Sequence, residues 1–179
     1  MIKAIETKLK GCFILEPQVF EDDRGYFFES YNHEAFCNAI GREVVFIQDN
    51  FSFSKKGVLR GLHYQKGEHA QAKLVSVLKG KVQDVVVDIR KDSPTYGQHI
   101  SIELSSDNKK QLFVPRGFAH GFLVLSETAR FFYKCDNYYN KESEEGIRYD
   151  DETLGIDWGI SMDHLILSER DRSLPPIKT

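Results

Sequence analysis

The stretch "VLRGLHYQ" at residues 58–65 decides the fold, together with "VPRGFAHGF" at residues 114–122. Valine, leucine and aromatic residues dominate both stretches, which is typical of buried β-strands. Each stretch also carries an arginine and a histidine, which a dry protein core does not accommodate without partners. The two stretches therefore predict a β-rich shell that encloses a polar site.

Strand geometry alone separates the polar side chains of the first stretch. Period-2 alternation puts Arg60 on one face and His63 on the other. A bulge of one residue would bring both to the same face. Gly61 is the expected position of this bulge, since glycine often marks one inside a strand. Both side chains would then point into the mouth of a small barrel, a usual place for a ligand site.

Period-2 alternation recurs from end to end, between turns rich in Gly, Asp, Asn and Pro. The predicted strands are residues 12–16, 26–30, 44–54, 58–65, 73–78, 81–90, 98–104, 111–114, 120–125 and 129–136. Ten short strands suit a barrel or a sandwich. The fold class is therefore mainly β.

The rest of the chain contributes little regular structure. One amphipathic helix is predicted at residues 32–40, with Asn32 as its N-cap and Gly41 at the C′ position. From about residue 140 the pattern weakens into polar turns and a tail. At 179 residues the chain is expected to form one domain, 1–179.

Composition excludes several classes of function. A formal charge of −3 and an apolar fraction of 41% indicate neither a disordered chain nor a basic surface for nucleic acid. Neither a signal peptide nor an apolar run of about 18 residues is present, so we expect a cytoplasmic protein without a membrane partner. Cys12, Cys37 and Cys135 are odd in number and widely spaced, which predicts reduced, packed thiols.

Residues 81–90 carry two acids in an apolar strand. Asp84 and Asp88 share one face with Val82 and Val86, while the other face is almost entirely apolar. An acid on a buried face needs a partner. This face therefore indicates either a polar cavity or two acids without a functional role.

Three histidines, His63, His69 and His120, could supply imidazoles to a metal. The sequence lacks a His-x-His pair, and His69 lies in a Gly/Glu turn, which argues against a catalytic metal site. No Ser or Cys stands in a nucleophile motif. Proton transfer remains: a His base, a Tyr or Lys as acid or electrostatic stabiliser, and a carboxylate that orients the His. Each of these residues could also have a purely structural role.

Seven motifs in order carry a resemblance to a known family. They are "DDRGYFFES" (22–30), "QDNFSFSKKGVLRGLHYQ" (48–65), "QAKLV" (71–75), "VVDIRKDSPTYG" (86–97), "NKKQLFVPRGFAHGFLVLS" (108–126), "YKCDNYY" (133–139) and "LSERD" (167–171). Together they resemble the dTDP-4-dehydrorhamnose 3,5-epimerase family of nucleotide-sugar epimerases. The resemblance extends from about Gly11 to Pro175.

The resemblance implies a cupin-type jelly-roll barrel with a few short helices. The barrel would span about residues 11–138, and an active-site tail would span about 140–179. "PRGFAH" resembles the second cupin motif, while the first keeps His63 but lacks the second metal-binding His. The family is metal-free, needs no cofactor, and forms homodimers that exchange N-terminal strands.

The resemblance also implies catalytic roles. His63 matches the base that removes a proton next to the C4 ketone, and Asp171 the carboxylate that orients it. Lys73 matches the group that stabilises the enolate oxygen. Tyr133 matches the acid that returns a proton from the opposite face.

Further positions match substrate contacts of the family. Arg24 matches a contact to the diphosphate, and Tyr139 matches the aromatic residue that stacks on thymine. Arg170 stands where relatives often have Lys. The remaining expected contacts are Glu29, Gln48, Asn50, Arg60, His120 and Glu144.

The expected function is therefore conversion of dTDP-4-dehydro-6-deoxy-glucose to dTDP-4-dehydro-β-L-rhamnose by proton transfer at C3 and C5. The nearest alternative is a relative that inverts one of these carbons or acts on another nucleotide-linked 4-keto sugar. A metal-dependent cupin oxygenase and a non-catalytic sugar-binding module are more distant alternatives.

Overall fold

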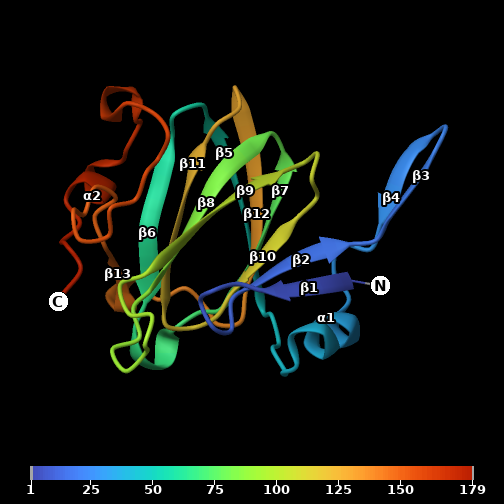
Figure 1. The fold of residues 1–179 in the computed structure, drawn as a ribbon, viewed down its shortest axis with the longest axis horizontal. Helices are drawn as coiled ribbons and strands as arrows, with labels where there is room; N and C mark the ends of the chain where they lie inside the picture. Colours follow the sequence, from blue (N-terminus) through green and yellow to red (C-terminus); the bar gives the residue numbers. More distant parts are fainter. Residues whose placement is uncertain (1, 179) are drawn as a thin grey trace.

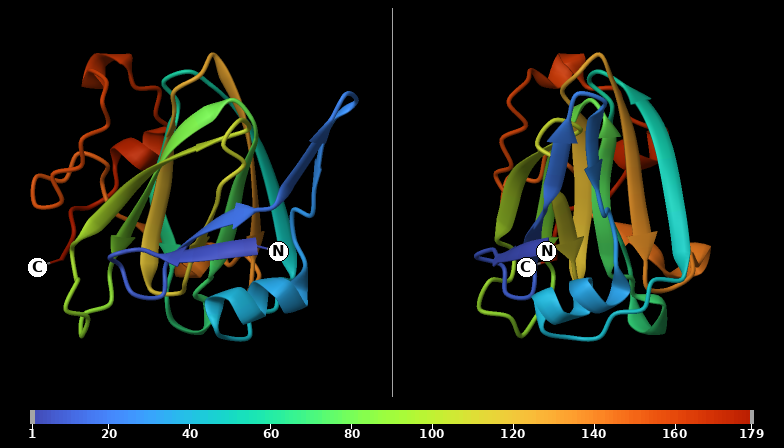
Figure 2. Two further views of the ribbon diagram at one scale, coloured as in Figure 1. Left: turned by 45° about the vertical axis from the view of Figure 1, so that its right-hand side comes forward. Right: turned by 90° about the vertical axis from the view of Figure 1, so that its right-hand side faces the viewer.

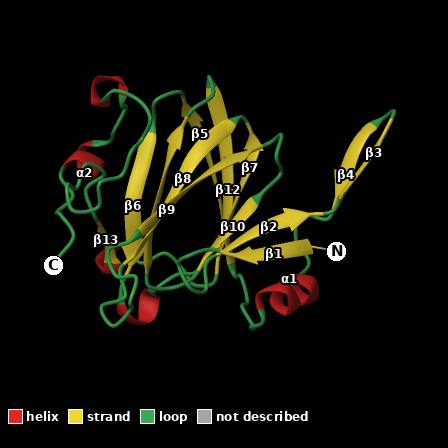
Figure 3. Ribbon diagram, in the orientation of Figure 1, coloured by secondary structure: helices red, strands yellow, loops and turns green. Residues whose placement is uncertain are grey.

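The computed structural model describes residues 2–178 and has two β-sheets that face each other as a jelly roll (Figure 1; Figure 3). The first sheet has the order β1-β2-β10-β7-β12-β5, and the second has the order β13-β6-β11-β8-β9. The first sheet contains β1 (Ile2–Glu6), β2 (Phe13–Pro17), β10 (Gln111–Val114), β7 (Lys73–Lys79), β12 (Thr128–Cys135) and β5 (Gln48–Lys55). The second contains β13 (Glu144–Gly146), β6 (Leu59–Gln65), β11 (Phe118–Val124), β8 (Lys81–Asp88) and β9 (His99–Ser105). The expected mainly β, cupin-like fold is confirmed.

Strand β8 explains why the second sheet is apolar on both faces. Val82 and Val86 pack into the core between the sheets. Val85 and Val87 pack in a second core on the other face, against residues from the C-terminal part of the chain. Because both faces of β8 are covered, its sequence is apolar on both sides and lacks the apolar–polar alternation of a half-exposed strand.

The bulge expected at Gly61 is present. His120 of β11 pairs with His63 of β6, but two residues further on Phe122 pairs with Arg60, so β6 has one more residue than β11 in this interval. Gly61 has a φ of 122°, and a Cβ there would lie 2.5 Å from the Cα of Gly121. The backbones of β6 and β11 therefore approach too closely for any side chain at this position.

The C-terminal segment, residues 147–177, covers the outer face of the second sheet. Its apolar residues pack on β6, β8 and β11, with Trp158 fully buried among them. Ile166 forms a parallel bridge with Val58, and its backbone bonds to Gly57 and Leu59 fix the segment beside the start of β6. The short helix α2 (Glu169–Arg172) lies near the end of this segment.

The N-terminal part extends away from the barrel. Strands β3 (Val19–Asp22) and β4 (Gly25–Phe28) form a hairpin that projects from the body of the molecule, on the side opposite α2 (Figure 1; Figure 2). Helix α1 (His33–Ile40) follows. The Asn32 side chain accepts a bond from the N–H of Ala35, and Gly41 has a φ of 71°, so both expected caps are confirmed.

Some predicted boundaries were wrong. Residues 44–47 are not part of β5, and β1, β3 and β13 were not predicted. Strand β1 is a short edge strand in which only Ile2 and Ala4 pack on the core, and β3 belongs to a separate two-stranded hairpin with mostly exposed residues, so both leave a weak pattern in the sequence. Short 3₁₀ helices at Gly67–His69, Lys141–Ser143 and Met162–His164 complete the fold.

All three cysteines are free thiols and buried, as expected. Among residues 2–178, no helix has the length and apolar character needed to span a membrane.

Candidate active site

A cavity of about 370 Å³ opens between the two sheets beside α2. Both sheets contribute to it, and α2 closes one side. Eight of the residues that the sequence singles out line it: Asn50, Arg60, His63, Lys73, His120, Tyr133, Arg170 and Asp171. Arg60 and His63 meet here because of the bulge between them, and the Nε–H of Arg60 donates to the hydroxyl of Ser54 at 3.1 Å.

His63 is paired with Asp171 across 108 residues of sequence. Its Nε2 lies 2.6 Å from Asp171 Oδ1. The His63 side chain is 26% exposed and the Asp171 side chain 6%. Burial acts to raise the pKa of Asp171, but the hydrogen bond and charge of His63, together with Ser168 and Arg170, outweigh it and hold the pKa below its usual range.

Ser168 holds Asp171 in place through the N-terminus of α2. Its hydroxyl accepts a bond from the Asp171 N–H at 3.0 Å and donates one to Asp171 Oδ2 at 2.8 Å. This is a capping arrangement in which the cap and the third helical residue bind each other. The carboxylate is thereby fixed before it meets the imidazole.

His120 forms a second pair, with Asp84 on the neighbouring strand β8. Its Nε2 lies 2.9 Å from both carboxylate oxygens. The Asp84 side chain is fully buried and that of His120 is 7% exposed. Burial raises the pKa of Asp84, opposed by the charges of His120 and Lys73.

Lys73 and Tyr133 lie on neighbouring strands of the first sheet and face the two imidazoles. The ammonium of Lys73 is 5.7 Å from the centroid of the Tyr133 ring. Burial lowers the pKa of Lys73, while negative charges that include Glu144 and Asp84 oppose this. Burial raises the pKa of Tyr133 to about 12, so its phenol keeps its proton at neutral pH.

The rim of the cavity is a chain of polar contacts. The Tyr139 hydroxyl donates to Glu144 Oε2 at 2.7 Å, and Arg170 forms an ion pair with the same carboxylate. Gln48 joins this rim, because its amide accepts from the N–H of Tyr139 and donates to Asn50 at 3.2 Å. The Tyr139 side chain remains 54% exposed.

Arg24 and Glu29 do not reach the cavity of their own chain. Arg24 lies in the turn between β3 and β4 and pairs with Asp22. Glu29 follows β4, and its carboxylate accepts a 3.5 Å bond from Asn32. The hairpin and α2 lie on opposite sides of the molecule (Figure 1).

Two residues at the site were missed in the sequence. The pattern marked Asp84 as a buried acid but gave no partner for it. Ser168 escaped notice, although a serine three residues before an acid is a recognisable helix-start signal. The role of Ser168 could have been found from this signal, whereas the partner of Asp84 depends on the register between β8 and β11.

Each histidine of the cavity is hydrogen-bonded to a carboxylate, and the two imidazoles are not bonded to each other. Across residues 2–178, a single group of three potential metal ligands has its atoms within 4.8 Å: His33, Cys37 and Glu43, at α1. His33 is already paired with Glu43 there at 2.7 Å. The donor set of the cavity itself is that of a proton-transfer site.

The fold and this cavity define a cupin-like enzyme of the carbohydrate epimerase class, and comparison with known proteins gives the family. The family model described as dTDP-4-dehydrorhamnose 3,5-epimerase matches residues 6–179. A dTDP-4-dehydrorhamnose 3,5-epimerase of Salmonella typhimurium is 56% identical over 161 residues, which are 90% of this chain and 88% of that protein.

Solved structures agree with this assignment. The dTDP-4-dehydrorhamnose 3,5-epimerase from Elizabethkingia anophelis has 58% identity and a TM-score of 0.94, with 98% of this chain and 96% of that chain covered. The dTDP-6-deoxy-D-glucose-3,5-epimerase from Legionella pneumophila, in complex with dTDP-4-keto-L-rhamnose, has 47% identity and a TM-score of 0.94, with 99% and 93% covered. This chain belongs to the dTDP-4-dehydrorhamnose 3,5-epimerase family.

Proposed function

We propose that this enzyme converts dTDP-4-dehydro-6-deoxy-glucose to dTDP-4-dehydro-β-L-rhamnose by inverting C3 and C5, a step of dTDP-L-rhamnose biosynthesis. The observation that carries the proposal is the composition of one cavity: a carboxylate-bound imidazole, a buried ammonium and a protonated phenol. The membership of the family and the likeness to a relative that holds dTDP-4-keto-L-rhamnose support the choice of substrate.

His63 acts as the base in this proposal. Both carbons lie next to the C4 ketone, so their protons are acidic enough for an imidazole to remove. Asp171 occupies Nε2, which leaves Nδ1 as the nitrogen that takes the proton. The carboxylate then stabilises the imidazolium that forms.

Lys73 stabilises the enolate that results. Loss of the carbon-bound proton moves negative charge to the C4 oxygen, and an ammonium in a cavity shielded from water stabilises that charge strongly. The lowered pKa of Lys73 follows from burial. Burial here is the cost of placing a cation where the oxygen charge develops.

Tyr133 returns the proton. Inversion requires that the new proton arrive on the face opposite the base, since one group on one face would restore the starting configuration. A phenol with a pKa of about 12 is protonated at neutral pH and can donate. The tyrosinate left behind lies near the Lys73 ammonium, which balances its charge.

The remaining cavity and rim residues bind the substrate. Arg60 and His120 contact the sugar, and Arg170 provides a fixed cation for the diphosphate. The half-exposed ring of Tyr139 offers a face on which thymine can stack. We assign further polar contacts to Gln48, Asn50 and Glu144.

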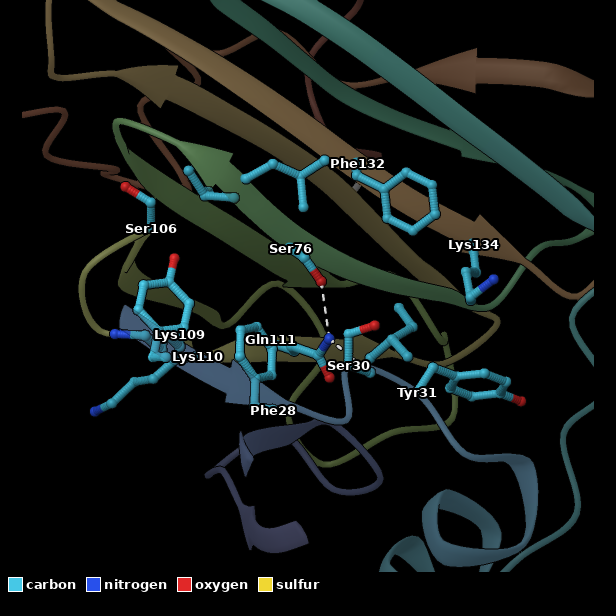
Figure 4. A pocket seen from close by; sticks show the side chains of 14 residues that line it. Phe28, Ser30, Tyr31, Ser76, Ser106, Lys109, Lys110, Gln111, Phe132 and Lys134 are labelled. Atoms are coloured by element: carbon cyan, nitrogen blue, oxygen red, sulfur yellow. Dashed lines mark hydrogen bonds between the residues drawn. The ribbon is translucent and has the colours of Figure 1, made fainter. Parts of the chain in front are cut away.

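The active form in this proposal is a homodimer that exchanges N-terminal strands, so that Arg24 and Glu29 act in the site of the partner. Several large apolar side chains support an interface. Phe20, Tyr26 and Phe27 of the hairpin are more than half exposed. A cavity of about 380 Å³ between β4 and the outer face of the first sheet is lined by Tyr26, Phe28 and Phe132 (Figure 4).

Complementation between two inactive variants tests the dimer. Arg24→Ala and His63→Asn proteins are unfolded together, refolded and assayed. If Arg24 serves the partner, a mixed dimer contains one intact site and about a quarter of parental activity returns. If Arg24 serves its own chain, every site lacks one residue and the mixture stays inactive.

We also propose that the enzyme works in the cytoplasm.

Isotope exchange tests the reaction itself. The protein is incubated with dTDP-4-dehydro-6-deoxy-glucose in D₂O, and deuterium at C3 and C5 is followed by NMR. Label at both carbons, with the rhamnose configuration trapped by a reductase, is the expected result. Label at one carbon identifies a single-site epimerase. Label at neither contradicts the proposal and directs the search to other nucleotide sugars.

A further inference from the structure

Asp84 lies directly behind the cavity rather than in its wall. The cavity is lined by His120, and the carboxylate that binds His120 from behind is fully buried. Within residues 2–178, His120 is its one hydrogen-bond partner, through two contacts of 2.9 Å to a single nitrogen. Any influence of Asp84 on a bound sugar therefore passes through His120.

Asp88 shows what a purely structural acid looks like on the same strand. It is also fully buried, and it faces the same side of β8 four residues later. Its carboxylate is saturated by Arg90, Ser93 and Thr95, which close the turn that follows the strand. Asp84 has no such network. Its placement is explained by the imidazole alone.

The contact determines which nitrogen of His120 can meet a ligand. An ionised carboxylate only accepts hydrogen bonds, so Nε2 must carry a hydrogen. Nδ1 has no protein partner among the described residues. Within these residues the buried polar side-chain atoms without a partner are Ser52 Oγ and Gln111 Oε1, so Nδ1 retains access to the cavity.

The cavity beside Nδ1 is also lined by two cations, Lys73 and Arg60. A neutral ring adds an acceptor between them without a third positive charge. A neutral ring with hydrogen on Nε2 presents the lone pair of Nδ1. That lone pair accepts a hydrogen bond, and the donors on a sugar ring are hydroxyl groups.

We propose that Asp84 is a positioning residue for the epimerisation: it holds His120 as the neutral Nε2–H tautomer, and Nδ1 then accepts a hydrogen bond from a hydroxyl of the bound sugar. The inference rests on the proposed function, because it concerns how the same cavity orients its substrate. It adds to that function a residue that does not touch the substrate.

The tautomer is measured first, because this measurement needs neither a variant nor turnover. ¹⁵N NMR of the parent protein with labelled histidine, assigned with His120→Gln, reports the protonation of each ring nitrogen. We expect a protonated Nε2 and an unprotonated Nδ1 at neutral pH. A hydrogen on Nδ1, alone or together with one on Nε2, overturns the proposal.

Asp84→Asn is the matching variant, with Asp88→Asn as a control of equal burial on the same strand. The amide that replaces the Asp84 carboxylate can turn its NH₂ toward the ring and reverse the tautomer. We expect kcat/KM to fall by about 10-fold or more in Asp84→Asn, a change of the size expected when one buried hydrogen bond is lost. Asp88→Asn should keep parental kcat/KM even where it lowers the melting temperature.

The double variant Asp84→Asn/His120→Gln separates positioning from general destabilisation. If Asp84 acts through His120, its replacement changes kcat/KM little once the imidazole is gone. A further loss of the full 10-fold in the double variant overturns the proposal. Should Asp84→Asn fail to fold, the NMR measurement on the parent still decides.

Failure of this inference can be told apart from failure of the proposed function. If the parent exchanges deuterium at C3 and C5 while His120 has hydrogen on Nδ1, only the role of Asp84 falls. If the parent shows no exchange with the dTDP sugar, the proposed function falls, and the tautomer of His120 is still measured independently.

Discussion

The two imidazole–carboxylate pairs of the cavity use the same chemistry but are built in different ways. Asp84 and His120 lie on adjacent, paired strands, so the sheet itself brings them together. Asp171 comes from a four-residue helix in the C-terminal segment and reaches His63 across 108 residues. The first pair depends on strand register, and the second depends on how well a surface segment packs.

The environments of the carboxylates follow from this difference. Asp84 sits within the sheet, where burial raises its pKa. Asp171 is held by Ser168 at a helix start, and its pKa lies below its usual range because His63, Ser168 and Arg170 together outweigh burial. The comparison teaches that burial makes ionisation costly for the acid built into the barrel, a cost that His120 and Lys73 oppose, whereas the acid at the barrel edge is held ionised and can stabilise a forming imidazolium.

Replacing His63 should have the largest effect. In His63→Asn the base is lost, and deuterium exchange at C3 and C5 should fall by ~10²-fold or more, which is the usual contribution of a general base. His69→Asn is the control, because His69 is 39% exposed and lies outside the cavity. Unchanged exchange in His63→Asn would remove this pair from the mechanism and leave His120 as the candidate base.

Replacing Asp171 should have the next largest effect. Asp171→Asn leaves the imidazole in place but without the charge that stabilises its protonated form, so kcat should fall by about 10²-fold with a smaller change in KM. Steady-state kinetics and circular dichroism together show whether activity is lost from a folded barrel. A parental kcat in Asp171→Asn would mean that the Asp171 carboxylate does not contribute to catalysis.

Replacing Ser168 should have a smaller effect that is specific to the delivered pair. Ser168→Ala removes the helix cap and one bond to the carboxylate, which costs about 1 kcal/mol and predicts a decrease in kcat of about 5-fold. Ser173→Ala is the control in the same segment, because its hydroxyl contacts only a backbone carbonyl there. Equal effects of both changes would argue that the segment as a whole, rather than the cap, orients Asp171.

The smallest expected effect is on the pH dependence of stability: the contributions of Asp171 and Asp84 should each change the melting temperature by a few degrees. The folded pKa of Asp171 is depressed below 3.8, so its stabilisation is complete above that pH and is lost as the pH falls through the folded pKa. The folded pKa of Asp84 is raised, so stability falls as the pH rises from 3.8 through that pKa.

Melting curves between about pH 3 and pH 7 test this opposition of sign. Asp171→Asn should flatten the loss of stability on acidification, and Asp84→Asn should flatten the loss on neutralisation. Parallel curves for the two variants would show that the carboxylates do not differ in the way their surroundings indicate.

The sequence predicts the strands of the barrel core better than the short strands at the sheet edges. Alternation found most of β5 and the bulge at Gly61, because a core on one side leaves a regular pattern in the sequence. It missed β1, β3 and β13, which are short strands with few buried apolar residues. The pairing of His63 with Asp171 came only from the family resemblance, since no local pattern links residues so distant. The partner of Asp84 required the register between β8 and β11, which a single sequence does not contain.

The contact between Gly61 and Gly121 has a consequence for how this enzyme can change over generations. Both imidazoles flank the place where these two backbones nearly touch, so a side chain at either glycine shifts both histidines at once. A substitution of a side chain that lines the cavity alters the contacts of that side chain alone. The spacing between the imidazoles is different, because it depends on two positions that leave no room for a side chain.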